Sequence, residues 1–136
     1  MRNVLNAHLS RPAPAGAGQP FVTLLVLISA IGLTYLPGAF ELTLFDRYAI
    51  AQGEWWRLLS GHFTHTGSSH LGWDLLAAAI ATGYLEKYNR ALAIRALVSG
   101  IVSVNLLLLS PFSNLQFYCG LSGVLFAPLT VIIIQI

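Results

Sequence analysis

The stretch Ala96–Ile136 reads ALVSGIVSVNLLLLSPFSNLQFYCGLSGVLFAPLTVIIIQI and contains no Asp, Glu, Lys or Arg. Pro12–Phe40 and Leu75–Leu85 are also uncharged. Of all 136 residues, 56% are hydrophobic and 9% are charged, whereas about a quarter are charged in soluble domains. The composition therefore predicts a protein that spans a lipid bilayer several times. It excludes collagen, disordered tails and disulfide scaffolds, and the absence of a Lys or Arg run argues against a nucleic-acid partner.

Four apolar segments predict four transmembrane helices, at about residues 21–37, 70–85, 92–110 and 119–136. Residues 1–20 are rich in Pro and Gly and are expected to form a flexible tail, so the membrane domain is expected to cover residues 21–136. A signal peptide is the alternative for the first segment, although its leader is long and no Ala-x-Ala site follows. Residues 39–69 mix Trp and Arg with apolar side chains, which suits a loop at the membrane interface. We expect an all-α transmembrane bundle.

The basic residues predict the orientation of these spans. Arg2 and Arg11 lie in the tail, and Lys87, Arg90 and Arg95 lie between the second and third spans. Cytoplasmic loops carry such an excess of Lys and Arg, so the N-terminus is expected in the cytoplasm. The interfacial loop and the connection before the fourth span should then both face the opposite side.

Two groups of polar residues open spans at that opposite face. His70 and Asp74 are four residues apart and share one face of the second helix. An ionisable residue within a span marks a functional site by default, although a structural hydrogen bond is the alternative. Ser122 lies in Gly120-Leu121-Ser122-Gly123, where the fourth helix begins and free backbone N–H groups could hold an oxyanion. Tight packing of small residues between helices is the other interpretation of this motif.

Taken together, these motifs resemble the rhomboid intramembrane serine proteases in order and spacing. The resemblance rests on Trp56-Arg57, His62 and His65 in the first loop, His70-x-x-x-Asp74, and Gly120-Leu-Ser122-Gly123. It implies that Ser122 is the catalytic nucleophile and that His70 and Asp74, with Gly120 and Gly123, form or support the oxyanion site. It also implies that Trp56, Arg57, His62 and His65 organise the interfacial loop. The substrates implied are transmembrane or membrane-anchored proteins, cleaved near the membrane boundary.

Two features depart from the common rhomboid pattern. Asp74 stands where the family usually has Asn, and an ionised carboxylate cannot donate a hydrogen bond, so it would act either protonated or by orienting His70. Asp at this position is similar to the rhombosortase branch, which processes secreted proteins that bear a C-terminal Gly-Gly, hydrophobic helix and basic tail. The general-base His of the family lies on a sixth span and has no counterpart in this chain. We therefore expect four of about six spans, and an inactive fragment when this chain is alone.

No cofactor is implied by this resemblance. His62-x-x-His65 with His70 is a weak zinc pattern, since the H-E-x-x-H motif is absent, and we expect no metal. Two alternatives to a protease remain: a pseudoprotease that binds transmembrane segments without cutting them, and a fragment that does not fold stably. The resemblance implies residence in a bacterial inner membrane, with Ser122 near the periplasmic face.

Overall fold

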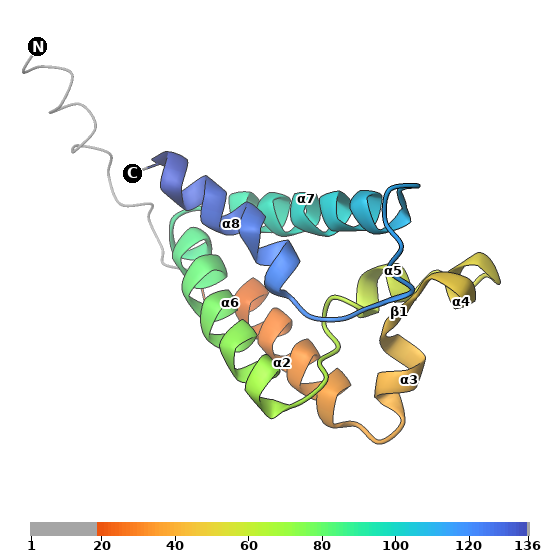
Figure 1. The fold of residues 1–136 in the computed structure, drawn as a ribbon. Coiled ribbons are helices and arrows are strands. Elements are labelled where there is room, and N and C mark those ends of the chain that lie inside the picture. Colours follow the sequence, from red (N-terminus) through yellow and green to blue (C-terminus); the bar gives the residue numbers. More distant parts are fainter. Residues whose placement is uncertain (1–18, 136) are drawn as a thin grey trace, which may run out of the picture.

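The computed structural model describes residues 19–135, and the expected tail at residues 1–18 lies outside this range. Long helices dominate the described part of the chain (Figure 1). They are α2 (Phe21–Tyr35), α6 (Ser68–Tyr88), α7 (Arg90–Leu109) and α8 (Ser122–Gln135). Between α2 and α6 lie the short helices α3 (Ala39–Thr43), α4 (Arg47–Ala51) and α5 (Arg57–Ser60), and strands β1 (Phe45–Asp46) and β2 (Phe117–Tyr118) pair with each other.

Local sequence explains where the long helices begin and end. Leu36 is extended and ends α2, because the residue before a proline, here Pro37, avoids the helical region. One residue, Asn89, separates α6 from α7, and its side chain caps α7 by accepting a hydrogen bond from the N–H of Leu92 at 3.0 Å. So short a connection makes α6 and α7 neighbours in space.

The long helices pack as two adjoining pairs. Figure 1 shows α2 alongside α6, and α8 alongside α7. Gly100 lets α7 and α8 approach closely, because a Cβ at this position would collide with the carbonyl oxygen of Val124. The largest buried apolar cluster joins all four helices and comprises Val26, Ala30, Leu71, Ala78, Leu97, Leu121, Val124 and Leu125.

A buried carboxylate fixes one end of the α2–α6 pair. Glu86, near the end of α6, accepts hydrogen bonds from the N–H groups of Val22 and Thr23, both at 2.9 Å. It also accepts from the Thr23 hydroxyl at 3.0 Å and from Arg90 Nε at 3.1 Å. The first N–H groups of a helix have no partner within it, so Glu86 caps α2 from a neighbouring helix.

The segment between α2 and α6 is held by side-chain contacts with backbone carbonyls. Arg57 is buried, donates to the carbonyl oxygens of Glu41 and Leu44 at 2.9 and 2.8 Å, and pairs with Glu54 at 2.7 Å. Trp56 is exposed, and its Nε1–H donates to Leu42 O at 3.0 Å. This part of the chain is therefore an ordered arrangement of short helices.

The same segment is joined to the connection between α7 and α8. Phe45 pairs with Tyr118 and Asp46 pairs with Phe117 in a two-stranded antiparallel ladder. Arg47 donates to the carbonyl oxygens of Leu108, Ser113 and Leu115, the last two at 2.9 and 3.2 Å. The sequence predicted helices alone. The ladder pairs residues more than 70 positions apart, and no local sequence pattern indicates such a pairing.

The four long helices fall close to the four segments that the sequence singled out. Among the described residues, Arg90–Leu109 is the helix that is long and apolar enough to cross a bilayer by composition, while α2 and α8 are shorter apolar helices. Many large apolar side chains face outward, among them Ile28, Trp73, Ile80, Val102, Leu106 and Ile133. Buried charged groups with apolar outer surfaces are the arrangement expected of a protein in lipid.

Candidate active site

Ser122 is the first residue of α8 and is exposed, whereas the preceding Leu121 is completely buried. The turn before the helix depends on Gly120, whose φ of +112° lies in a region that residues with a Cβ rarely adopt. The N–H of Gly120 donates to the carbonyl of Gly61 at 3.1 Å. The interfacial loop therefore fixes the chain directly before Ser122.

Both glycines of the Gly-Leu-Ser-Gly motif lie where a larger residue would collide. A Cβ on Gly120 would lie 2.8 Å from the ring of His70 and 3.2 Å from Asp74 Oδ2. A Cβ on Gly123 would lie 2.8 Å from the hydroxyl oxygen of Tyr118. The motif thus lets His70 and Asp74 of α6 approach the backbone on one side of Ser122, and Tyr118 approach it on the other.

Asp74 connects α6 to the start of α8. Its Oδ2 accepts hydrogen bonds from the N–H groups of Leu121 at 2.7 Å and Ser122 at 3.1 Å. Asp74 is buried, and these N–H groups lie at a helix N-terminus, where a negative charge is stabilised. The carboxylate therefore positions the candidate nucleophile through its backbone.

Two histidines surround the same carboxylate. His65 Nε2 lies 3.0 Å from Asp74 Oδ2, and His70 Nε2 lies 3.6 Å from it. His65 is buried, and its Nδ1 lies 3.1 Å from the carbonyl oxygen of Phe63. His70 is partly exposed, and its Nδ1 lies 3.4 Å from the hydroxyl oxygen of Thr66. Asp74 is thus closer to His65 than to His70, the residue with which the sequence spacing paired it.

The backbone N–H groups expected near the oxyanion site already have a hydrogen-bond acceptor. The Ser122 N–H, expected to face an oxyanion, donates to Asp74, and Asp74 accepts hydrogen bonds. The reason is that unpaired N–H groups at a helix N-terminus attract the nearest carboxylate. Asp74 Oδ2 acts as an acceptor for both N–H groups, and it lies 3.6 Å from Nε2 of His70, the residue that Asp74 was expected to orient. His70 is the partly exposed imidazole beside the turn.

His62 lies apart from this cluster. It is buried, neither ring nitrogen has a hydrogen-bond partner among residues 19–135, and its ring packs edge-on against Tyr118 with centroids 5.6 Å apart. Burial lowers the pKa of His62, because the apolar surroundings disfavour the imidazolium. The Oδ1 of Asn105 is likewise buried without a partner in the described part of the chain.

Several residues that shape the site were not found from the sequence. Tyr118 donates from its hydroxyl to Gly120 O at 3.0 Å, and burial raises the pKa of this phenol. Asn105 donates to Leu58 O at 2.8 Å and so joins α7 to the interfacial loop. An Asn within an apolar span was a signal of a polar contact between helices. Tyr118 offered no comparable signal, because aromatic residues are common at membrane interfaces.

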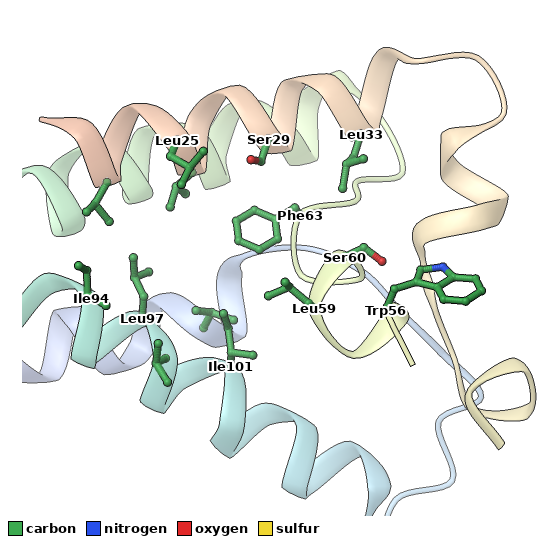
Figure 2. Close-up of a pocket in the computed structure, with 14 residues that line it drawn as sticks. Leu25, Ser29, Leu33, Trp56, Leu59, Ser60, Phe63, Ile94, Leu97 and Ile101 are labelled. Atoms are coloured by element: carbon green, nitrogen blue, oxygen red, sulfur yellow. The ribbon is translucent and has the colours of Figure 1, made fainter. Parts of the chain in front are cut away.

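An apolar hollow of about 660 Å³ lies between α2 and α7. Figure 2 shows Leu25, Ser29 and Leu33 of α2 on one side and Ile94, Leu97 and Ile101 of α7 on the other, with Leu59 and Phe63 between them. Val124, two residues after Ser122, also lines the hollow, but the lining contains none of His65, His70, Asp74 and Ser122. The hollow is thus a feature separate from the polar cluster.

The fold and this cluster define a class: a helical membrane protein in which a serine at a helix N-terminus is held by buried polar groups of another helix. The family model described as Rhomboid domain matches residues 52–136, which is more than half of the chain. The chain therefore belongs to the rhomboid family, whose members are integral membrane proteins and, at the family level, intramembrane serine proteases. Neither the curated proteins nor the solved structures that were compared with the chain gave a match.

Proposed function

We propose that this protein is an intramembrane serine endopeptidase in which Ser122 attacks a peptide bond of a membrane-anchored substrate near the membrane boundary. The observation that carries the proposal is the setting of Ser122. It is exposed, it begins α8 between two glycines that the packing requires, and its N–H is held by a buried carboxylate. An exposed serine at a helix N-terminus is well placed for acyl transfer.

The groups around Ser122 support distinct roles. His65 holds Asp74, Asp74 holds the backbone at Leu121 and Ser122, and the partly exposed His70 is the group that could reach a developing oxyanion. Asp74 is thus a positioning residue. For a substrate to use the Ser122 N–H as well, this N–H must leave Asp74, and its 3.1 Å contact is the longer of the two backbone hydrogen bonds.

Residues 19–135 contain no histidine placed to act as the general base for Ser122. No hydrogen bond joins a histidine to the Ser122 hydroxyl in this range, and the family's base lies on a later span by the resemblance noted above. A serine hydroxyl without a base is a weak nucleophile at neutral pH. We therefore expect the 136-residue chain by itself to be inactive, and activity to return when a base is supplied.

Exogenous imidazole can supply that base. The purified chain in detergent micelles is treated with a fluorophosphonate probe, with and without imidazole. We expect labelling only with imidazole, increasing with its concentration and absent in Ser122→Ala, while Ser110→Ala labels like the unmodified chain. Labelling that persists in Ser122→Ala would refute Ser122 as the nucleophile. Strong labelling without imidazole that Ser122→Ala removes would refute the missing base while retaining the nucleophile.

The substrate proposal follows from Asp74, whose resemblance to the rhombosortase branch favours a C-terminal anchor with Gly-Gly, a hydrophobic helix and a basic tail. Two reporters test it in cells that produce the protein in its membrane, one with Gly-Gly before the helix and one with Leu-Leu there. We expect cleavage of the Gly-Gly reporter alone, and no cleavage when Ser122→Ala replaces the unmodified protein. Equal cleavage of both reporters would contradict this substrate class. The bacterial inner membrane, with the N-terminus inside, belongs to the same proposal.

The hollow between α2 and α7 favours a second candidate, a protein that binds transmembrane segments without cutting them. Its lining is almost wholly apolar, and its volume exceeds that of several side chains. A photo-crosslinking residue at Leu25 or Ile101 would capture a bound segment, and one at the outward-facing Leu106 is the control. Capture at the hollow that persists in Ser122→Ala, without any cleavage in membranes, would favour this candidate over the protease.

A further inference from the structure

Three side chains that can bind a metal ion converge beside α8. They are His65, His70 and Asp74, and their donor atoms all lie within 4.8 Å of one another. His65 comes from the loop before α6, and the other two lie one turn apart on α6. Zinc sites in proteins use imidazole nitrogens and carboxylate oxygens of this kind.

The far side of each imidazole is already occupied. His65 Nδ1 faces the carbonyl oxygen of Phe63 at 3.1 Å, and His70 Nδ1 faces the hydroxyl oxygen of Thr66 at 3.4 Å. A histidine that binds a metal commonly donates its other N–H to such an oxygen, which fixes the tautomer and the ring orientation. Both Nε2 atoms are thereby directed to Asp74.

The spacing of the donors is close to that of a tetrahedral site. Bonds of 2.0–2.1 Å place neighbouring ligand atoms about 3.3 Å apart. The distances from Asp74 Oδ2 to the two Nε2 atoms are 3.0 and 3.6 Å, on either side of this value. The donor atoms lie within 4.8 Å of one another, so the widest separation must shorten when the ion binds, and His70 is the more exposed of the two histidines.

We propose that His65 Nε2, His70 Nε2 and the Asp74 carboxylate bind one zinc ion, with water as the fourth ligand. The sequence pattern paired His62 with His65 and lacked an acidic ligand. The structure leaves His62 outside the cluster and supplies Asp74 as that ligand. Zinc binding does not rest on the protease function. If that function holds, zinc would immobilise His70 and Asp74 and is expected to inhibit Ser122.

Cobalt is a spectroscopic substitute for zinc that reports the ligand geometry directly. The full chain in detergent micelles, freed of metal by a chelator, is titrated with Co²⁺ alone and then with Zn²⁺. We expect visible d–d bands of a four-coordinate site that saturate at one equivalent and that Zn²⁺ abolishes. Absence of these bands, together with no Zn²⁺ binding by calorimetry, would overturn the proposal.

Variants identify the ligands in the same titration. His70→Ala and Asp74→Asn are each expected to weaken binding at least tenfold, and His70 is exposed enough for its variant to fold. His62→Ala is the matched control, since it removes a histidine of the same loop that lies outside the cluster, and it should bind like the unmodified chain. The proposal is overturned if His70→Ala binds Co²⁺ with unchanged affinity, or if His62→Ala weakens binding equally. Thermal unfolding of each variant checks its fold.

Discussion

Asp74 and Glu86 are two buried carboxylates on the same helix, and each caps the N-terminus of a different neighbour. Asp74 accepts from the N–H groups of Leu121 and Ser122 of α8, and Glu86 accepts from those of Val22 and Thr23 of α2. They are twelve residues apart, so about 18 Å of helix separates them. The backbone contacts of the two sites are thus nearly the same.

Their side-chain partners differ. Glu86 pairs with Arg90, which stays charged at every physiological pH, and its other partners are two backbone N–H groups and the Thr23 hydroxyl. Asp74 pairs with His65 and lies beside His70, which can exchange protons or bind metals, and it adjoins an exposed serine. An ionisable residue within a membrane helix therefore does not by itself identify an active site. The partners of a buried carboxylate must be considered as well, because they determine which chemistry it can support.

The largest expected difference between the two ends is in activity. Asp74→Ala should lower Ser122-dependent labelling in the imidazole assay by about 100-fold or more, because the turn that presents Ser122 loses its anchor. Glu86→Gln should leave labelling of the folded protein within about twofold, because it acts at the far end of α6. Equal losses in both variants would show that the two carboxylates do not differ in function.

Stability should respond most strongly to the structural carboxylate. Glu86→Ala leaves two N–H groups of α2 without their acceptor, and Arg90 without its partner, so we expect a loss of about 2–4 kcal/mol in the free energy of unfolding. Glu86→Gln keeps an acceptor oxygen and should lose less. Unfolding in mixed detergent micelles measures the stability of both variants. An unchanged free energy of unfolding in Glu86→Ala would show that Glu86 does not stabilise the fold.

The sequence predicted the long helices well, because uninterrupted apolar runs and their breaks at Pro37 and Pro111 are local signals. It also indicated that His70, Asp74 and Ser122 open helices at one face. It missed His65 as the closer partner of Asp74, since the two residues are nine positions apart, His65 lies in the loop before α6, and no helical period relates them. It missed Glu86 as a cap and Arg47 as a loop anchor, because their partners lie more than 60 residues away.

Acidification should lower the free energy of unfolding through His62, which is buried near the turn that precedes Ser122. Burial lowers its pKa from the ordinary 6.5 in the folded protein. As the pH falls through about 6.5, the unfolded chain therefore takes up this proton more readily than the folded chain, and the free energy of unfolding falls. Unfolding measured between pH 8 and pH 5 should show this fall, and His62→Gln should reduce the slope. An unchanged slope would assign the pH dependence to other groups.

The smallest expected effect comes from Tyr118→Phe. This change removes the hydroxyl that donates to Gly120 O at 3.0 Å, while the ring stays packed against His62. We expect a loss of about 0.5–1.5 kcal/mol in unfolding free energy, as for a single hydrogen bond. Tyr35→Phe, at an exposed position at the end of α2, is the control and should have no effect. A loss above about 3 kcal/mol would mean that Tyr118 supports more than this turn.

The single-residue connection at Asn89 has a consequence for how the protein enters its membrane. Polar groups make α6 a poor candidate for insertion alone, whereas α7 has the length and composition to insert without help. With one residue between them, the two helices are expected to leave the translocon together as a hairpin. Partitioning of α7 into lipid would then carry Asp74 and Glu86 into the membrane ahead of α8.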